Sequence, residues 1–229
     1  MGGAPIGCVA LDVGETIIDE SRIAARWARR LGVPPLTLFA LMGGMVATGR
    51  STFEAFTILR PDFDMAAELE RWRTAEPEGM RTGFDADDLY PDTRPALAEL
   101  RAVGLRVVIA GNQPVQAGPA LVAMDLPADA IHTSEEWGVA KPDPAFFAKV
   151  AEAAGRPPGQ ILYVGDRVDN DVVAAADAGM RTALLRRGPF GYLHAERPEA
   201  ARADAVIDGL GELPGLVARL NAETGPGEG

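Results

Sequence analysis

The feature that most limits the possible folds is an alternation of short apolar runs with helix-forming segments, which begins near residue 90. Together with an earlier run at 7–12, the apolar runs predict strands at 106–111, 130–133, 161–165, 181–185 and 205–207. Strands that alternate with helices pair in parallel, and helices cover both faces of their sheet. The chain is therefore predicted to be an α/β protein with a three-layer, Rossmann-like parallel sheet as its core.

Residues 19–88 break this alternation, because the stretch contains no convincing strand. An apolar residue at every fourth position from Ile23 to Leu31 predicts an amphipathic helix. Residues 65–73 predict another helix, and the paired glycines within 41–44 predict a break between helices.

We expect residues 1–18 and 89–222 to form the α/β core domain and residues 19–88 to form a small all-helical cap domain. Residues 223–229 are rich in glycine and proline and are expected to be a disordered tail. In open α/β sheets the ligand crevice lies beyond the carboxyl ends of the strands. A helical insert after the first strand would sit above that crevice, so we expect it to act as a lid.

Charge and composition narrow the possible partners. The net charge is −11, from 22 basic and 33 acidic residues, which argues against binding to nucleic acid or to anionic membranes. No stretch approaches the roughly 18 apolar residues of a membrane span, and the N-terminus lacks a signal-peptide pattern. Cys8 is the single cysteine, which excludes an internal disulfide and suits a reducing compartment. We therefore expect a cytoplasmic protein, monomeric or homodimeric, that binds neither nucleic acid nor membranes.

Three separate segments carry residues suited to hydrolytic chemistry. The apolar run 8–11 ends in Asp12, and a carboxylate at a strand end can attack a phosphorus or a carbon atom. Lys141 precedes a Pro-Asp-Pro sequence that fixes the chain in an extended form ahead of a helix. An acidic turn at 166–171 follows a predicted strand, and its three carboxylates repel one another unless a cation is near.

In this order and spacing, the three segments resemble the haloacid dehalogenase-like superfamily, whose members are mostly Mg²⁺-dependent phosphatases that work through an aspartyl-phosphate. Asp12 and Thr16 match the first family motif. Lys141-Pro142-Asp143-Pro144 matches the third motif, and residues 165–180 match the fourth. Leu89-Tyr90-Pro91 is similar to the point where the chain re-enters the core domain after a helical cap.

The resemblance implies roles for the residues of the site and a Mg²⁺ cofactor. Asp12 would be the nucleophile and a Mg²⁺ ligand, and Lys141 would neutralise charge beside it. Asp166 and the backbone carbonyl of Gly14 would supply further oxygen ligands. Asp171 is either part of the metal site or an N-cap, because it stands at a predicted helix start. The expected substrate is a small phosphorylated metabolite.

Two positions depart from the family pattern. Gly14 stands where the family's phosphatases carry a second aspartate that acts as general acid and base. Gly111 stands where a serine or threonine would bind the transferring phosphoryl group. Glu15 keeps a carboxyl group in the same loop and is our candidate for the missing acid/base catalyst, although adjacent side chains in an extended loop point apart. The alternative for Glu15 is a surface position or a helix-cap contact.

The substrate-binding candidates lie near the ends of the first two core strands and in the helical insert. They are Thr16, Gly111, Asn112, Gln113 and Arg50. Asn112 could hydrogen-bond a phosphate or orient Asp12, and Thr16 could do the same or cap the following helix. For Arg50 a solvated position on a helix is the favoured interpretation.

These residues favour a Mg²⁺-dependent phosphatase, and two alternatives remain open. The missing side chains at Gly14 and Gly111 would suit a non-catalytic or repurposed member that binds a phosphorylated ligand. A metal-independent, haloacid dehalogenase-type hydrolase also lacks the second aspartate. The intact acidic turn at 166–171 speaks against this last alternative, which needs no metal.

Overall fold

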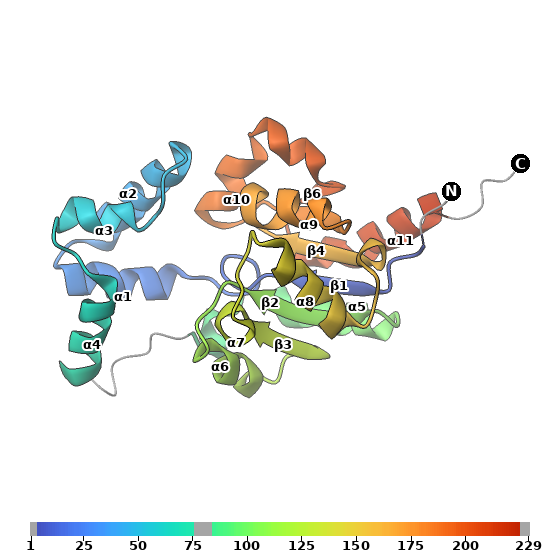
Figure 1. The fold of residues 1–229 in the computed structure, drawn as a ribbon, viewed down its shortest axis with the longest axis horizontal. Helices are drawn as coiled ribbons and strands as arrows, with labels where there is room; N and C mark the ends of the chain where they lie inside the picture. The colour runs from blue at the N-terminus through green and yellow to red at the C-terminus, as the bar shows by residue number, and fades with distance from the viewer. Residues whose placement is uncertain (1–3, 76–83, 225–229) are drawn as a thin grey trace, which may run out of the picture. The chain divides into compact units, whose positions relative to one another are not determined.

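The computed structural model describes residues 4–75 and 84–224. The chain divides into two compact units, one made of Met1–Asp19 with Asp85–Gly229 and the other of Glu20–Phe84 (Figure 1). The first unit is the α/β part of the protein and carries the candidate site. Within its described residues the second unit contains helices joined by short connections and no strand.

The α/β unit is built on a six-stranded sheet with the strand order β3-β2-β1-β4-β5-β6, in which every neighbouring pair is parallel. Its strands are β1 (Cys8–Leu11), β2 (Arg106–Gly111), β3 (Ala130–Thr133), β4 (Ile161–Gly165), β5 (Arg181–Leu185) and β6 (Ala205–Ile207). The predicted strands are confirmed, and so is the α/β architecture. Strand β1 is shorter than predicted by one residue at each end.

Helices lie on both faces of this sheet, as the strand–helix alternation requires (Figure 1). They are α5 (Thr93–Ala102), α6 (Ala117–Ala123), α7 (Ser134–Trp137), α8 (Pro144–Ala154), α9 (Ala174–Asp177), α10 (Gly188–Ala195) and α11 (Leu213–Thr224). Helix α8 contacts β1 and β2, while α5 contacts β2 and α11. The two faces of the sheet are thus buried under separate sets of helices.

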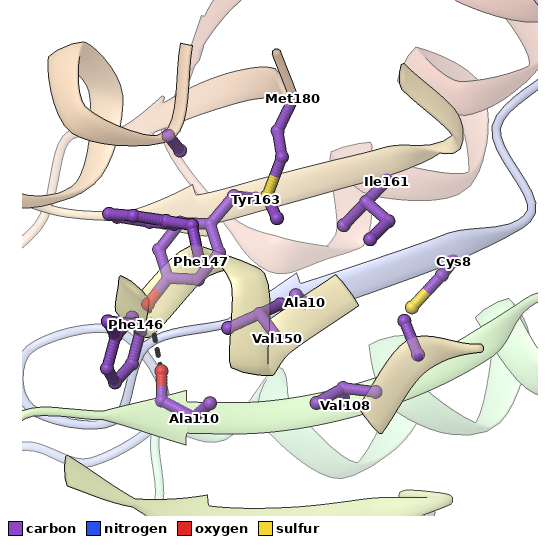
Figure 2. Packing of buried hydrophobic residues seen from close by; sticks show 12 residues of the cluster. Cys8, Ala10, Val108, Ala110, Phe146, Phe147, Val150, Ile161, Tyr163 and Met180 are labelled. Atoms are coloured by element: carbon purple, nitrogen blue, oxygen red, sulfur yellow. Dashed lines mark hydrogen bonds between the residues drawn. The ribbon is translucent and has the colours of Figure 1, made fainter. Parts of the chain in front are cut away.

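Alternate residues of the central strands point to opposite faces of the sheet, and one face forms a cluster with α8 (Figure 2). Its largest members are Phe146, Phe147 and Tyr163, all buried. The hydroxyl of Tyr163 donates a hydrogen bond of 2.8 Å to the carbonyl of Ala110, which satisfies the polar end of a buried ring (Figure 2). This cluster packs α8 against β1, β2 and β4, the strands whose carboxyl ends carry the candidate site.

Helix α8 begins and ends where its sequence predicts. The Asp143 side chain accepts a hydrogen bond from the backbone N–H of Ala145, and Pro144 occupies the first turn. Gly155 ends the helix with a φ of 60°, in the left-handed region that glycine favours. These local signals place the helix directly after Lys141.

The helical unit consists of α1 (Ser21–Leu31), α2 (Pro35–Ala47), α3 (Glu54–Leu59) and α4 (Met65–Ala75). The break predicted within 41–44 is wrong, because α2 continues through both glycines. Each glycine costs a helix interior about 1 kcal/mol. Burial of Leu38, Met45 and Val46 outweighs that cost.

Two further stretches differ from the predicted elements. The helix predicted to start near Asp171 begins earlier, as a π-helical turn, η3 (Val168–Val173), and continues as α9. Helix α11 includes Glu223 and Thr224 of the predicted tail, whereas 225–229 lie outside the described residues. Among the described residues no single helix could cross a membrane. Helices α1 and α2 reach that threshold only as a pair, with a bend of 111° between them.

Replacing Phe147 with alanine tests the core described above. We expect the free energy of unfolding to fall by about 3–5 kcal/mol, because the lost ring leaves a cavity in a close-packed cluster. The shift of the urea midpoint measures this change. The control is Val122→Ala at an exposed position of α6, for which we expect a change of no more than about 1 kcal/mol. Equal effects of the two substitutions would contradict this view of the core.

Candidate active site

The proposed nucleophile lies directly beyond the end of the central strand. Strand β1 ends at Leu11, and the N–H of Asp12 donates to the carbonyl of Val164 at 2.9 Å, which continues the pairing with β4 by one residue. The Asp12 side chain is 10% exposed. The carboxylate therefore stands at the edge of the sheet where ligands of open α/β folds bind.

Lys141 brings a buried ammonium group to this carboxylate. Its Nζ lies 2.7 Å from Oδ1 of Asp12 and 2.5 Å from Oδ1 of Asp171. Burial by itself would lower the pKa of Lys141, but the two carboxylates outweigh that effect and raise the pKa well above its ordinary value. The lysine is therefore a fixed positive charge between two acidic side chains.

Asn112 holds the backbone of Lys141 in place. Its side-chain Nδ2 donates to the Lys141 carbonyl at 2.9 Å, and its Oδ1 accepts from the Lys141 N–H at 2.8 Å. Both polar atoms of the amide thus bond to one residue. The structure places Asn112 against Lys141, and its binding to a phosphate stays a prediction.

Three carboxylates converge on the same point. One oxygen each of Asp12, Asp166 and Asp171 lies within 4.8 Å of the others, and all three residues are buried. Oδ2 of Asp166 is buried without a hydrogen-bond partner in the part of the chain that the structure describes. Burial, and then the nearby carboxylates of Asp171 and Asp12, raise the pKa of Asp166 well above its usual range.

The charges of this cluster do not balance. Three carboxylates face the single ammonium of Lys141, and burying uncompensated charge is costly. A divalent cation would remove the excess, and it would give the unpartnered oxygen of Asp166 a partner. The donors are hard carboxylate oxygens, which suit Mg²⁺. The residues present therefore fit a Mg²⁺ site.

Asp171 belongs to this cluster and does not cap a helix. Its Oδ2 accepts from the backbone N–H of Arg167, the residue before η3, at 2.9 Å, while its Oδ1 faces Lys141. Burial raises the pKa of Asp171 to about 6, even though Lys141 acts in the opposite direction. A Cβ at Gly165 would lie 2.3 Å from Cγ of Asp171. The glycine that ends β4 is what allows this close approach.

The same close approach explains the second departure from the family pattern. A Cβ at Gly111 would lie 2.3 Å from Oδ1 of Asp12 and 3.1 Å from the backbone nitrogen of Val13. With the Asp12 carboxylate in the position seen here, a side chain at the end of β2 would require that carboxylate to shift. Glycine at this position leaves room for the Asp12 carboxylate as it lies in this structure.

Glu15 and Thr16 continue the turn after Asp12. Glu15 has a φ of 50°, and its Oε2 accepts a hydrogen bond of 2.6 Å from the hydroxyl of Tyr90. Thr16 is fully buried, and its carbonyl accepts from Nη1 of Arg187 at 2.8 Å. Neither side chain is among the groups that surround Lys141 in the contacts described above. Their roles toward a substrate stay predictions.

The remaining substrate-binding candidates, Gln113 and Arg50, make no described contact with Asp12 or Lys141. Gln113 follows Asn112, and its carbonyl accepts from the N–H of Glu135 at 3.3 Å. Arg50 belongs to the helical unit, where its Nη2 lies 2.6 Å from Oε2 of Glu54. Both groups of that ion pair are largely exposed, in keeping with the solvated interpretation.

Sequence reasoning missed three side chains around the site. Tyr163 lies with its ring centre 5.4 Å from Nζ of Lys141, and Tyr90 and Arg187 hold the turn after Asp12. Arg187 lies just after the end of β5, and this position at the carboxyl end of a strand could have marked it as a site residue. Nothing in the pattern of the apolar strand around Tyr163 distinguishes its hydroxyl from an ordinary core ring.

Comparison with known proteins agrees with this geometry. Residues 6–179 match the family model of haloacid dehalogenase-like hydrolases. The chain is 31% identical over 205 residues to Phosphatase MT3486 of Mycobacterium tuberculosis (strain CDC 1551 / Oshkosh), which covers 86% of this chain and 93% of that protein. It is 36% identical over 134 residues to the glyceraldehyde 3-phosphate phosphatase of Methanopyrus kandleri, but the match spans little more than half of either chain, 57%.

Solved structures share the fold. The HAD-hydrolase YfnB of Bacillus subtilis, solved bound to magnesium, superposes with a TM-score of 0.68 at 18% identity, over 93% of this chain and 99% of that chain. Dehalogenases are among the other structures with this fold. The family match, the parallel sheet and the cluster of Asp12, Lys141, Asp166 and Asp171 lead to one conclusion. The chain belongs to the haloacid dehalogenase-like hydrolases.

Proposed function

We propose that this protein is a Mg²⁺-dependent phosphatase that hydrolyses a small phosphorylated metabolite through an aspartyl-phosphate on Asp12. The observation that carries the proposal is the buried contact of 2.7 Å between Asp12 and Lys141, beside two further carboxylates. Relatives named as phosphatases support the same reaction class. The net charge of −11 suits a small substrate better than nucleic acid.

Asp12 acts first as a nucleophile. A carboxylate oxygen forms a bond to phosphorus, the ester P–O bond breaks, and the alcohol leaves with a proton taken from solvent or from an acidic group. Water then attacks phosphorus, which releases inorganic phosphate and restores the Asp12 carboxylate. Lys141 fixes the orientation of Asp12 and offsets negative charge on the phosphoryl group, which is most of what phosphoryl transfer requires.

The metal site would be formed by Asp12, Asp166 and the backbone carbonyl of Gly14, with Asp171 beside them. Mg²⁺ bound there supplies positive charge next to the transferring phosphoryl group. Asp171 holds Lys141 and is itself held by the N–H of Arg167. The helical unit Glu20–Phe84 is inserted after β1, and we assign it the role of a lid that selects the substrate.

The absence of a carboxylate at Gly14 affects which phosphate esters the enzyme can hydrolyse quickly. General acid catalysis contributes roughly 10²–10⁴-fold, so a phosphatase without it favours substrates with good leaving groups. Turnover of alkyl phosphates then depends on a group elsewhere, either Glu15 or a residue of the helical unit.

Two other functions make different predictions. A carbon–halogen hydrolase would release chloride from 2-chloropropionate regardless of EDTA; the unbalanced carboxylates of Asp12, Asp166 and Asp171 argue against it. A non-catalytic member would bind a phosphorylated ligand tightly without turnover, and Gly14→Asp would not change this. Activity gained by Gly14→Asp would indicate a weakened phosphatase.

The direct test of the proposal is Asp12→Asn in the presence of Mg²⁺. We expect hydrolysis of p-nitrophenyl phosphate to fall by about 10³-fold or more, because an amide is a poor nucleophile. EDTA should abolish turnover by the parent protein, and added Mg²⁺ should restore it. Asp177→Asn is the matched control, since Asp177 is exposed and pairs with Arg202 on the surface. No turnover of any phosphate ester by the parent protein would refute the proposal.

Gly111→Ser restores the hydroxyl of the family pattern, yet we expect it to lower kcat by about tenfold or more. Its Cβ would meet Asp12 at 2.3 Å and push the carboxylate away from Lys141. Gly118→Ser is the control, because a Cβ there would lie at an ordinary 3.8 Å from Thr133. A gain in kcat for Gly111→Ser would contradict the steric explanation.

Asn112→Ala tests how Lys141 is held. It removes both hydrogen bonds to the Lys141 backbone, and the looser lysine should lower kcat by about tenfold. Gln116→Ala, at an exposed position that makes no side-chain capping bond, serves as the control. If Asn112→Ala raises KM and leaves kcat unchanged, Asn112 contacts the substrate as the sequence suggested.

A further inference from the structure

The turn that follows Asp12 is gripped by two side chains from distant parts of the chain. The hydroxyl of Tyr90 donates to Oε2 of Glu15 at 2.6 Å across 75 residues. Nη1 of Arg187 donates to the carbonyl of Thr16 at 2.8 Å across 171 residues. We refer to Tyr90 and Arg187 together as the clamp.

The clamp is itself firmly held. The guanidinium of Arg187 lies 4.0 Å from the centre of the Tyr90 ring, a cation–π contact. Nη2 of Arg187 lies 2.6 Å from Oδ2 of Asp92, which also accepts from the N–H of Leu210 at 2.9 Å. Burial, and then the hydrogen bond to Glu15, raise the pKa of Tyr90 above its ordinary value, so its phenol stays protonated and remains the donor.

The surroundings of Glu15 leave space for its carboxylate. Its φ of 50° lies in the left-handed region, which residues with a Cβ rarely adopt and which persists only where the surroundings enforce it. A Cβ at Gly188 would lie 2.4 Å from Oε2 of Glu15. The glycine after Arg187 therefore leaves room for this carboxylate.

We propose that Tyr90 and Arg187 are positioning residues that hold the turn Asp12–Thr16 in place through Glu15 and Thr16. This inference rests on the proposed phosphatase function. Gly14 gives the turn extra backbone freedom, and displacement of a reacting group by about 1 Å can cost 10²-fold in rate. The clamp restrains that freedom from outside the site. Glu15 thereby connects the turn to Tyr90, since its Oε2 accepts the hydrogen bond from the Tyr90 hydroxyl.

Tyr90→Phe is the most selective test, because it keeps the ring under Arg187 and removes only the hydroxyl. We expect faster hydrogen exchange in the peptide that spans residues 12–18. With p-nitrophenyl phosphate and saturating Mg²⁺, kcat should fall about tenfold while KM changes little. Tyr192→Phe is the matched control, because Tyr192 is exposed on α10, and both of its measurements should equal those of the parent protein.

Substitutions of Glu15 complete the test. Glu15→Ala should reproduce the loss seen in Tyr90→Phe, and the double variant should be no worse than either, because all three remove the same bond. Glu15→Gln keeps an acceptor oxygen and should recover most of kcat. Loss in Glu15→Gln confined to alkyl phosphates, with p-nitrophenyl phosphate unaffected, would overturn the inference and make Glu15 the general acid.

Hydrogen exchange separates this inference from the proposed function. If the parent protein turns over no phosphate ester, the phosphatase proposal fails. Faster exchange in Tyr90→Phe would then still show that the clamp holds the turn. Unchanged exchange and unchanged kcat in Tyr90→Phe would overturn the clamp while leaving the phosphatase proposal intact.

Discussion

The buried contact of Lys141 with Asp12 and Asp171 is the interaction on which the rest of the site depends. One ammonium cannot neutralise three buried carboxylates at the end of the central strands, so burial disfavours the fully ionised cluster and raises the pKa of Asp166. Burying three carboxylates with one ammonium lowers the stability of the surrounding core, and a bound divalent cation would compensate the excess negative charge. This imbalance is the physical reason for the metal site, and through it the phosphoryl-group site, that we propose.

Three glycines make this arrangement sterically possible. Gly111 ends β2, Gly165 ends β4, and Gly188 follows β5 at the start of α10. A Cβ at each position would lie within 2.4 Å of a carboxylate-bearing side chain, namely that of Asp12, Asp171 and Glu15 respectively. Neighbouring strands lie about 4.8 Å apart, and a glycine at each of these three positions leaves space for the neighbouring acidic side chain. The departure from the family pattern at Gly111 belongs to this scheme.

The fold could be predicted from the sequence because several independent local signals indicate the same element. Each core strand is a short apolar run, and α8 carries an N-cap, a proline and a terminal glycine that agree with one another. The prediction failed where packing overrides propensity, as in α2, whose paired glycines lie inside a helix with a buried face. It also missed the π-helical turn η3, which contains Asp171, because no local sequence signal marks that turn.

The sequence by itself determined the parallel α/β core, because apolar strands and helix signals are local features. Its motifs, through their resemblance to the family, predicted Asp12, Lys141 and Asp166 as one candidate site and left Asp171 between the metal site and an N-cap. Only the tertiary structure decided where the ambiguous residues point. It turned Asp171 toward Lys141, used both atoms of the Asn112 amide to hold that lysine, and directed Glu15 to Tyr90. Those choices depend on distances between segments far apart in the chain, which no local pattern encodes.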